Sequence, residues 1–231
     1  MSRYAWLLFD ADGTLFDFQR AESIALKNTP FQMGLVVPAG YVETYHRINT
    51  LLWESFEAGD LLARDVRTKR FQWVFESLGI AGDAQAFSET FLRNLVEAST
   101  FLAEAKPLLA QLKLQYRLSL LTNGFADVQH ARIARLGVAS LFESIIISEE
   151  VGVAKPDPAI FDIVLERMGW PDKSTVLMIG DSLSSDILGG SNAGIDTCWF
   201  NPESKPNDSD VAPTYEIRRL GELRALLAIK E

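Results

Sequence analysis

The sequence is poor in the features that build disulfides, nucleic-acid grooves and membrane spans. Cys198 is the one cysteine among 231 residues, so no intramolecular disulfide can form, and the two histidines lack the spaced partners of a metal site. The formal net charge is −9 without any cluster of Lys and Arg, which argues against nucleic-acid binding. No apolar run approaches a membrane span, and the run that ends before Asp10 is too short for a secretory leader. We therefore expect a cytoplasmic protein with no nucleic-acid or membrane partner.

The residues that are present predict an α/β fold. Hydrophobic residues make up 48% of the chain and charged residues 23%, which is enough apolar material for a substantial core. Five short apolar runs predict buried strands, at 5–9, 118–121, 144–147, 176–179 and 197–200. Helical patterns follow near 104–115, 126–136, 157–169, 184–193 and 219–229. This alternation predicts a doubly wound parallel sheet with helices on both faces, and residues 201–213 read as a surface loop.

The stretch from 17 to 100 differs, because it holds helical patterns and no convincing strand. Apolar residues fall on one side of the patterns at 44–56 and 69–78, as in amphipathic helices. The sequence therefore predicts a core domain of residues 1–16 plus 101–231. Residues 17–100 would form an inserted helical cap over the ends of the strands; the alternative is a helical layer with no functional role.

Polar side chains follow four of the predicted strands, at the edge where open α/β sheets bind ligands. These residues supply carboxylates, an amine, a hydroxyl and a turn of small residues; they are Asp10, Asp12, Thr122, Asn123, Gly124, Lys155, Asp181 and Asp186. A single Asp in such a turn is usually a cap or an Asx-turn. Charges of both signs at the ends of successive strands have no structural reason to meet, so we expect a shared site.

This set resembles the haloacid dehalogenase superfamily, whose four motifs stand here in the family's order. They are DxDGTL at 10–15, the strand-ending Thr122, Lys155, and GDxxxxD at 180–186. The resemblance covers essentially the whole chain and implies a Rossmann-like sheet. In the order 3-2-1-4-5 the first and fourth strands are neighbours, which would bring Asp10 to Asp181.

The resemblance also implies the roles of the carboxylates in phosphate-ester hydrolysis. Asp10 would be the nucleophile, since a carboxylate is ionised at neutral pH without a base. Asp12 would protonate the leaving group and then activate water. The side chains of Asp10 and Asp181 and the main-chain carbonyl of Asp12 would bind Mg²⁺, with Mn²⁺ or Co²⁺ as substitutes. Asp186 would support the site through a water or by holding the lysine.

The remaining members would bind the phosphate. Thr122 and the amides of the Asn123-Gly124 turn would donate to its oxygens, and Lys155 would neutralise charge on the transferred group and on Asp10. Asp12 separates a phosphatase from the dehalogenases of the family, which release halide and need no acid there. Gly13 is the superfamily's commoner residue, although nucleotidases of this type can carry an acidic one.

Finer likeness, in the runs 147–156, 186–194 and 197–199, is to the bacterial pyrimidine 5′-nucleotidases of this superfamily. It implies hydrolysis of small phosphate esters, pyrimidine nucleoside monophosphates such as UMP, dUMP and dTMP, by a monomer or homodimer. The alternatives are a phosphatase acting on phosphoglycolate or a sugar phosphate, a phosphosugar mutase, and a binding protein without catalysis. The predicted cap carries no motif that chooses among these substrates.

Overall fold

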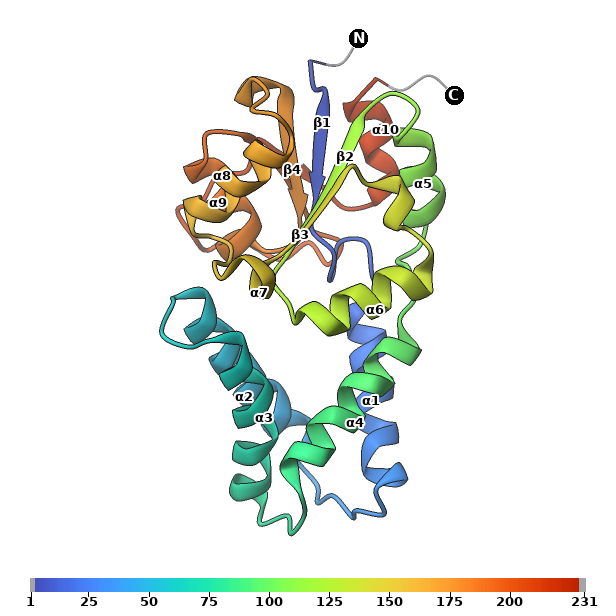
Figure 1. The fold of residues 1–231 in the computed structure, drawn as a ribbon, viewed down its shortest axis with the longest axis vertical. Coiled ribbons are helices and arrows are strands. Elements are labelled where there is room, and N and C mark those ends of the chain that lie inside the picture. Colours follow the sequence, from blue (N-terminus) through green and yellow to red (C-terminus); the bar gives the residue numbers. More distant parts are fainter. Residues whose placement is uncertain (1–2, 229–231) are drawn as a thin grey trace. The chain divides into compact units, whose positions relative to one another are not determined.

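The computed structural model describes residues 3–228, which divide into two compact units (Figure 1). The core unit comprises the chain up to Asp17, Thr100–Ala126 and the chain from Leu136 on. The helical unit comprises Phe18–Ser99 and Asp127–Arg135. Residues 127–135, which lie inside the predicted core, thus group with the inserted helices. That the helical unit acts as a cap stays a prediction.

A six-stranded sheet lies at the centre of the core unit, with the order β3-β2-β1-β4-β5-β6 and parallel pairing throughout. Its strands are β1 (Trp6–Phe9), β2 (Arg117–Thr122), β3 (Ser144–Ile147), β4 (Val176–Gly180), β5 (Asp196–Phe200) and β6 (Tyr215–Ile217). The predicted order of the first five strands is confirmed. The prediction missed β6, because a three-residue strand with one buried side chain gives no periodic signal.

The central strand is buried on both faces. All four residues of β1 are buried, as expected for a parallel strand covered by helices on each side. Trp6 and Leu8 pack with Ile160, Phe161 and other side chains of α8 (Pro158–Arg167). Helix α8 and α9 (Leu188–Asn192) lie on one side of the sheet, and α5 (Ala105–Leu112) and α10 (Leu223–Leu226) lie on the other (Figure 1).

Two of the predicted helices of the core unit differ in detail. The pattern at 184–193 forms a single π-helical turn, η3 (Leu183–Ile187), followed by α9. The pattern at 219–229 forms a 3₁₀ turn, η4 (Leu220–Glu222), and the short α10, and its residue 229 lies outside the described residues. The remaining elements are α7 (Ser148–Val151), η1 (Ala139–Leu141) and η2 (Lys173–Thr175). A Cβ at Gly190 would strike Thr197 of β5, so this glycine allows α9 to pack closely against the sheet.

Four helices make up most of the helical unit, and no strand occurs in Phe18–Ser99. They are α1 (Phe18–Gln32), α2 (Tyr41–Glu57), α3 (Ala63–Leu78) and α4 (Ala84–Ala98), joined by the central turns of α6 (Ala126–Leu136). Phe71 and Phe75 are buried, as their spacing predicts, whereas Leu51 is 49% exposed despite its place in the predicted apolar face. Across residues 3–228, none of the helices has the length and apolar character that a bilayer crossing requires.

Candidate active site

The strand order places the first and fourth motifs side by side. Phe9, the last residue of β1, pairs with Leu120 of β2 on one side and with Ile179 of β4 on the other. The next residue, Asp10, donates its N–H to the Ile179 carbonyl at 2.9 Å. Asp181 follows β4 directly, so two carboxylates leave neighbouring strands at the same edge of the sheet.

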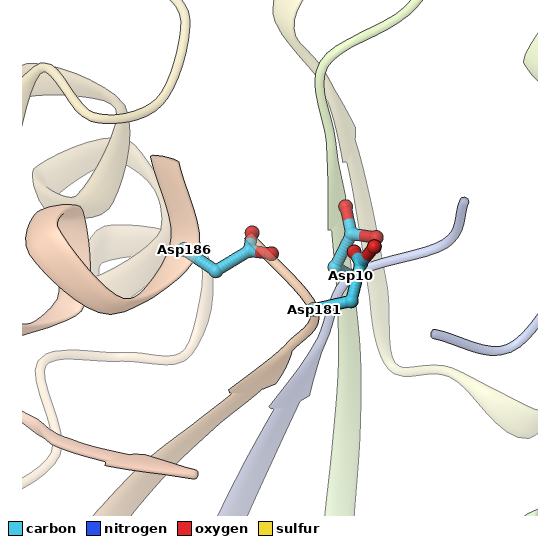
Figure 2. Close-up of side chains that lie close together, drawn as sticks. All are labelled: Asp10, Asp181 and Asp186. Carbon is cyan, nitrogen blue, oxygen red and sulfur yellow. The ribbon is translucent and has the colours of Figure 1, made fainter. Parts of the chain in front are cut away.

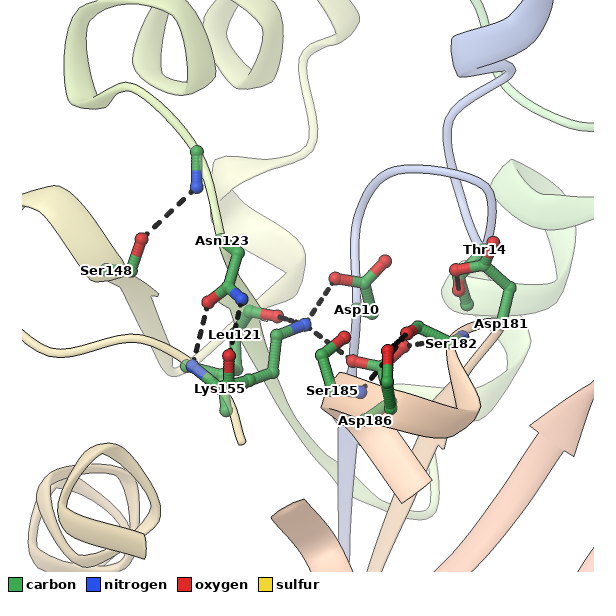
Figure 3. Close-up of polar contacts among 12 residues, drawn as sticks. Asp10, Thr14, Leu121, Asn123, Ser148, Lys155, Asp181, Ser182, Ser185 and Asp186 are labelled. Atoms are coloured by element: carbon green, nitrogen blue, oxygen red, sulfur yellow. Dashed lines mark hydrogen bonds and ion pairs between the residues drawn. The ribbon is translucent and has the colours of Figure 1, made fainter. Parts of the chain in front are cut away.

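Lys155 connects this edge to the rest of the motif residues (Figure 3). Its Nζ donates to Asp10 Oδ1 and to Asp186 Oδ1, both at 2.6 Å, and to the Leu121 carbonyl at 3.0 Å. The side chain is only 2% exposed. A buried ammonium is tolerated where its three donors all find acceptors, as these do. The predicted approach of Lys155 to Asp10 and Asp186 is therefore observed.

Three carboxylates surround the lysine. Oxygens of Asp10, Asp181 and Asp186 all lie within 4.8 Å of one another (Figure 2). Asp186 uses one oxygen for Lys155 and the other for the Ser182 N–H, at 3.1 Å. Because both of its oxygens accept protein donors, Asp186 fits a positioning role better than that of a metal ligand. Asp10 and Asp181 are then the carboxylates that could hold a cation.

The electrostatics of this cluster fit a divalent cation. Burial raises the pKa of Asp10 well above its usual range; Lys155 opposes that rise, and Asp186 and Asp181 reinforce it. Loss of solvent around the Asp181 carboxyl group, aided by the charge of Asp186, raises its pKa to about 7, although Asp181 as a whole residue keeps an exposed surface. Burial would lower the pKa of Lys155, but the carboxylates of Asp10 and Asp186 outweigh it and raise that pKa. One ammonium thus faces three carboxylates, and hard oxygen donors of this kind suit Mg²⁺.

The turn after β1 holds Asp12 beside the same cluster. Asp12 is half-buried and forms an isolated bridge with Phe16, and its charge contributes to the raised pKa of Asp181. Gly13 has φ +79°, and a Cβ there would overlap the Asp181 carboxylate. The hydroxyl of Thr14 lies 3.4 Å from Asp181 Oδ1. The acidic turn is therefore shaped around Asp181.

The residues predicted to bind phosphate make contacts of their own in this structure. Thr122 is buried at the end of β2. The side chain of Asn123 accepts from the Lys155 N–H at 2.9 Å and donates to the Lys155 carbonyl at 2.8 Å. The Gly124 N–H donates to the Ser148 hydroxyl at 3.3 Å. Their phosphate-binding role stays a prediction.

The sequence patterns did not indicate the Trp199 indole or the Leu121 carbonyl, and they assigned Asn123 a role only through the amides of its turn. Asn123 clamps the main chain of Lys155, and the indole of Trp199 donates to the Asp181 carbonyl at 2.9 Å. The Leu121 carbonyl accepts from the lysine. Leu121 could have been singled out because it precedes Thr122 at a strand end. No local signal in β5 marks Trp199, since its partner is chosen by sheet packing.

The motifs correspond to a known family, since residues 4–194 match the haloacid dehalogenase-like hydrolases. The chain belongs to this family. The chain is also similar to YfnB of Bacillus subtilis (strain 168), named as a HAD-hydrolase, with 37% identity over 100% of this chain and 98% of that protein. A crystal structure of B. subtilis YfnB, described as bound to magnesium, covers 98% of this chain and 100% of its own with a TM-score of 0.90.

Two further relatives carry the name of a specific activity. Pyrimidine 5′-nucleotidase YjjG of Escherichia coli (strain K12) is 36% identical, over 97% of this chain and 98% of its own. Pyrimidine 5′-nucleotidase PynA of Streptococcus pneumoniae (strain ATCC BAA-255 / R6) is 34% identical, over 93% of this chain and 91% of its own. The predicted superfamily, its hydrolase class and the likeness to pyrimidine 5′-nucleotidases are thereby confirmed.

Proposed function

We propose that this chain is a Mg²⁺-dependent phosphomonoesterase that works through an aspartyl-phosphate on Asp10. The observation that carries the proposal is the buried contact of Asp10 with Lys155, with Asp181 beside it on the adjacent strand. A nucleophilic carboxylate needs nearby positive charge before a phosphate dianion can approach it. The geometry supplies one such charge in Lys155 and, in Asp10 and Asp181, two carboxylates suited to a cation.

The proposed reaction consists of two successive displacements at phosphorus. A carboxylate oxygen of Asp10 attacks phosphorus, the bond to the ester oxygen breaks, and Asp12 gives that oxygen its proton. Asp12 then removes a proton from water, whose oxygen attacks phosphorus and releases inorganic phosphate with Asp10 restored. Lys155 holds Asp10 in place and offsets charge on the transferred group. Asp186 orients Lys155 through the 2.6 Å contact.

The side chains of Asp10 and Asp181 and the main-chain carbonyl of Asp12 would hold the cation. When bound, Mg²⁺ screens the repulsion between Asp10 and the phosphate oxygens. The magnesium described in the YfnB crystal structure supports this choice. Replacement by Mn²⁺ or Co²⁺ belongs to the same proposal, since both accept oxygen ligands in octahedral geometry.

The proposed substrates are pyrimidine nucleoside monophosphates, and the enzyme would act in the cytoplasm. The names of YjjG and PynA support this choice, because both align along nearly their whole length with this chain. A phosphate-release screen should rank UMP, dUMP and dTMP above purine nucleotides, phosphoglycolate and sugar phosphates. Preference for phosphoglycolate would overturn the substrate but leave the chemistry; an isomeric phosphate would indicate a mutase, and no release from any ester a binding protein.

Substitution of the nucleophile tests the mechanism. Asp10→Asn should abolish phosphate release from UMP because a neutral amide cannot form the acyl-phosphate. Asp208→Asn, at an exposed position of the 201–213 loop, is the matched control and should keep the wild-type rate. Circular dichroism checks that both variants fold. Normal turnover by a folded Asp10→Asn protein would exclude the mechanism.

The proton donor is tested by the leaving group. Asp12→Asn should lower the rate for UMP by about 10²–10⁴, the usual contribution of general acid catalysis. The loss in the step that forms the aspartyl-phosphate should be much smaller for p-nitrophenyl phosphate, whose leaving group needs no proton. Burst kinetics on both esters separate this step from the later hydrolysis. Equal losses in the first step would contradict the acid role of Asp12.

A further inference from the structure

A pocket of about 760 Å³ lies within the helical unit, between α1 and the start of α2. Glu22, Leu26 and Pro30 line it from α1, and Tyr41 and His46 line it from α2. Its volume is in the range of pockets that hold small organic ligands. All of its lining residues belong to the helical unit, and none of them is a member of the acidic cluster.

A buried carboxylate forms part of the wall. Glu22 is only 6% exposed, and its Oε1 accepts a hydrogen bond of 2.8 Å from the hydroxyl of Tyr45. Its Oε2 lies 3.6 Å from Nδ1 of His46. A carboxylate has about four acceptor positions, so Glu22 can also accept from a ligand in the pocket. Because Lys27 also lines the pocket, its wall carries charges of both signs, and the Glu22 carboxylate suits a ligand group that donates a hydrogen bond.

A buried hydroxyl is the second polar group of the wall. Tyr41 is 4% exposed, its ring packs edge-on against Phe87, and its hydroxyl has no hydrogen-bond partner among residues 3–228. An unsatisfied buried hydroxyl is unfavourable, and native proteins rarely leave one without a reason. A ligand that offers an acceptor to Tyr41 would remove this penalty. Leu26 and Pro30 provide an apolar wall against which a flat ring could lie.

We propose that this pocket binds a neutral heterocycle with an N–H donor next to a carbonyl acceptor, the edge presented by a uracil or thymine base. Glu22 would accept from the ring N–H, and Tyr41 would donate to the carbonyl. The identification of the ring as a pyrimidine rests on the proposed function. The same base could come from the nucleotide substrate or from a free nucleoside that binds as an effector, and both sources have the same recognition chemistry.

Uridine is the probe, because it carries the base without the phosphate. Calorimetric titration should show uridine binding to the wild-type protein, and about tenfold weaker binding to Tyr41→Phe and to Glu22→Gln, since each removes one polar contact. Tyr41→Phe should keep or raise the melting temperature, because its hydroxyl has no partner to lose among the described residues. Wild-type affinity in both variants, or no uridine binding by the wild type, would overturn the proposal.

Tyr116→Phe is the matched control. The Tyr116 hydroxyl is buried in the core unit and donates to the Leu227 carbonyl at 2.9 Å. Its loss should lower the melting temperature and leave uridine affinity unchanged. A drop in uridine affinity equal to that of Tyr41→Phe would mean that general destabilisation, and not the pocket, weakens binding, and the proposal would fail.

Kinetics distinguish the two sources of the base. Competitive inhibition of UMP hydrolysis by uridine assigns the pocket to the substrate's own base, whereas non-competitive inhibition or activation assigns it to an effector. In the first case Tyr41→Phe should raise KM for UMP by a larger factor than KM for p-nitrophenyl phosphate, which lacks the base. Phosphate release from UMP without uridine binding would overturn the proposed ligand of the pocket and leave the proposed substrate standing. Uridine binding that depends on Tyr41 and Glu22, without phosphate release from UMP, would overturn the proposed substrate alone.

Discussion

At the scale of single residues, the hydrogen bonds of Lys155 make the three carboxylates of the acidic cluster different from one another. Because it bonds to Asp10 and Asp186 but not to Asp181, the three carboxylates are not equivalent. Both oxygens of Asp186 accept protein donors, one from Lys155 and the other from the Ser182 N–H. Asp10 is held by the lysine, and Asp181 meets the hydroxyl of Thr14 at 3.4 Å, a weak contact. This asymmetry fits the three roles proposed for these carboxylates, a nucleophile, a cation ligand and a positioning residue, whose oxygens lie within 4.8 Å of one another.

Replacement of Gly13 should have two effects, strain in the backbone and a steric clash with Asp181. Gly13→Ala should lower stability, because φ +79° disfavours any side chain and because the new Cβ would strike Asp181. It should also weaken Mg²⁺ binding, since Asp181 must shift. Thermal melts and a Mg²⁺ titration of the variant measure both effects.

Gly34 provides the control for this prediction. It has φ +64°, but a Cβ added there would meet no atom within 4 Å, so Gly34→Ala carries the strain without the collision. We expect a loss of about 1–2 kcal/mol in the free energy of unfolding and unchanged Mg²⁺ affinity. Equal Mg²⁺ affinity in Gly13→Ala and wild type would show that the turn is not shaped around Asp181.

At the scale of elements, the site depends on hydrogen bonds and close packing between strand ends and the loops and turns near them. The end of β2 is joined to the loop after α7 by two hydrogen bonds between the Asn123 side chain and the main chain of Lys155. The π-helical turn η3 brings Asp186 close to Gly180, where a Cβ would overlap the Asp186 carboxyl group. Such turns occur frequently at functional sites. Each of these contacts orients one member of the charged cluster.

Loss of the hydrogen bonds between the Asn123 side chain and the Lys155 main chain should lower turnover without removing any charge. Asn123→Ala should reduce the rate of phosphate release about tenfold or more, because Lys155 loses both restraints on its main chain. The pH profile of the remaining activity should change, since the contact between Lys155 and Asp10 loosens. A change in KM for phosphate esters with the rate and pH profile unaltered would indicate direct phosphate binding by Asn123 instead.

At the scale of the whole molecule, the cluster links stability to pH. In the folded chain without metal, loss of solvent around the Asp181 carboxyl group raises its pKa to about 7, whereas an unfolded Asp titrates at about 3.9. Between these values the folded state binds more protons than the unfolded state, so the free energy of unfolding should fall as pH rises from about 4 to about 7. Melts in EDTA across this range should show the decline. Asp181→Asn should reduce it, and the exposed Asp208→Asn should not.

Magnesium should oppose this decline. An ion that binds only the folded state raises the melting temperature in proportion to the logarithm of its concentration once the site is saturated. We expect the increase near neutral pH in the wild-type protein and little increase in Asp181→Asn. An equal increase in both proteins would mean that Mg²⁺ acts elsewhere and would remove Asp181 from the cation site.

The sequence by itself determined the parts of this protein that depend on local pattern. Continuous apolar runs predicted the first five strands, because strands buried on both faces need no polar alternation. The motif residues could be placed at strand ends, and the resemblance supplied the order that brings Asp10 to Asp181. The tertiary structure confirms that order and the contact of Lys155 with both Asp10 and Asp186.

Only the tertiary structure decided the features that depend on partners distant in the chain. Strand β6 exists because it pairs with β5, and its three residues carry no pattern of their own. Asn123 reaches Lys155 across 32 residues, and Glu22 meets Tyr45 across 23. Residues 127–135 group with the inserted helices although they follow β2 directly. Periodicity reports which face of an element is buried, but packing between elements chooses what that face meets.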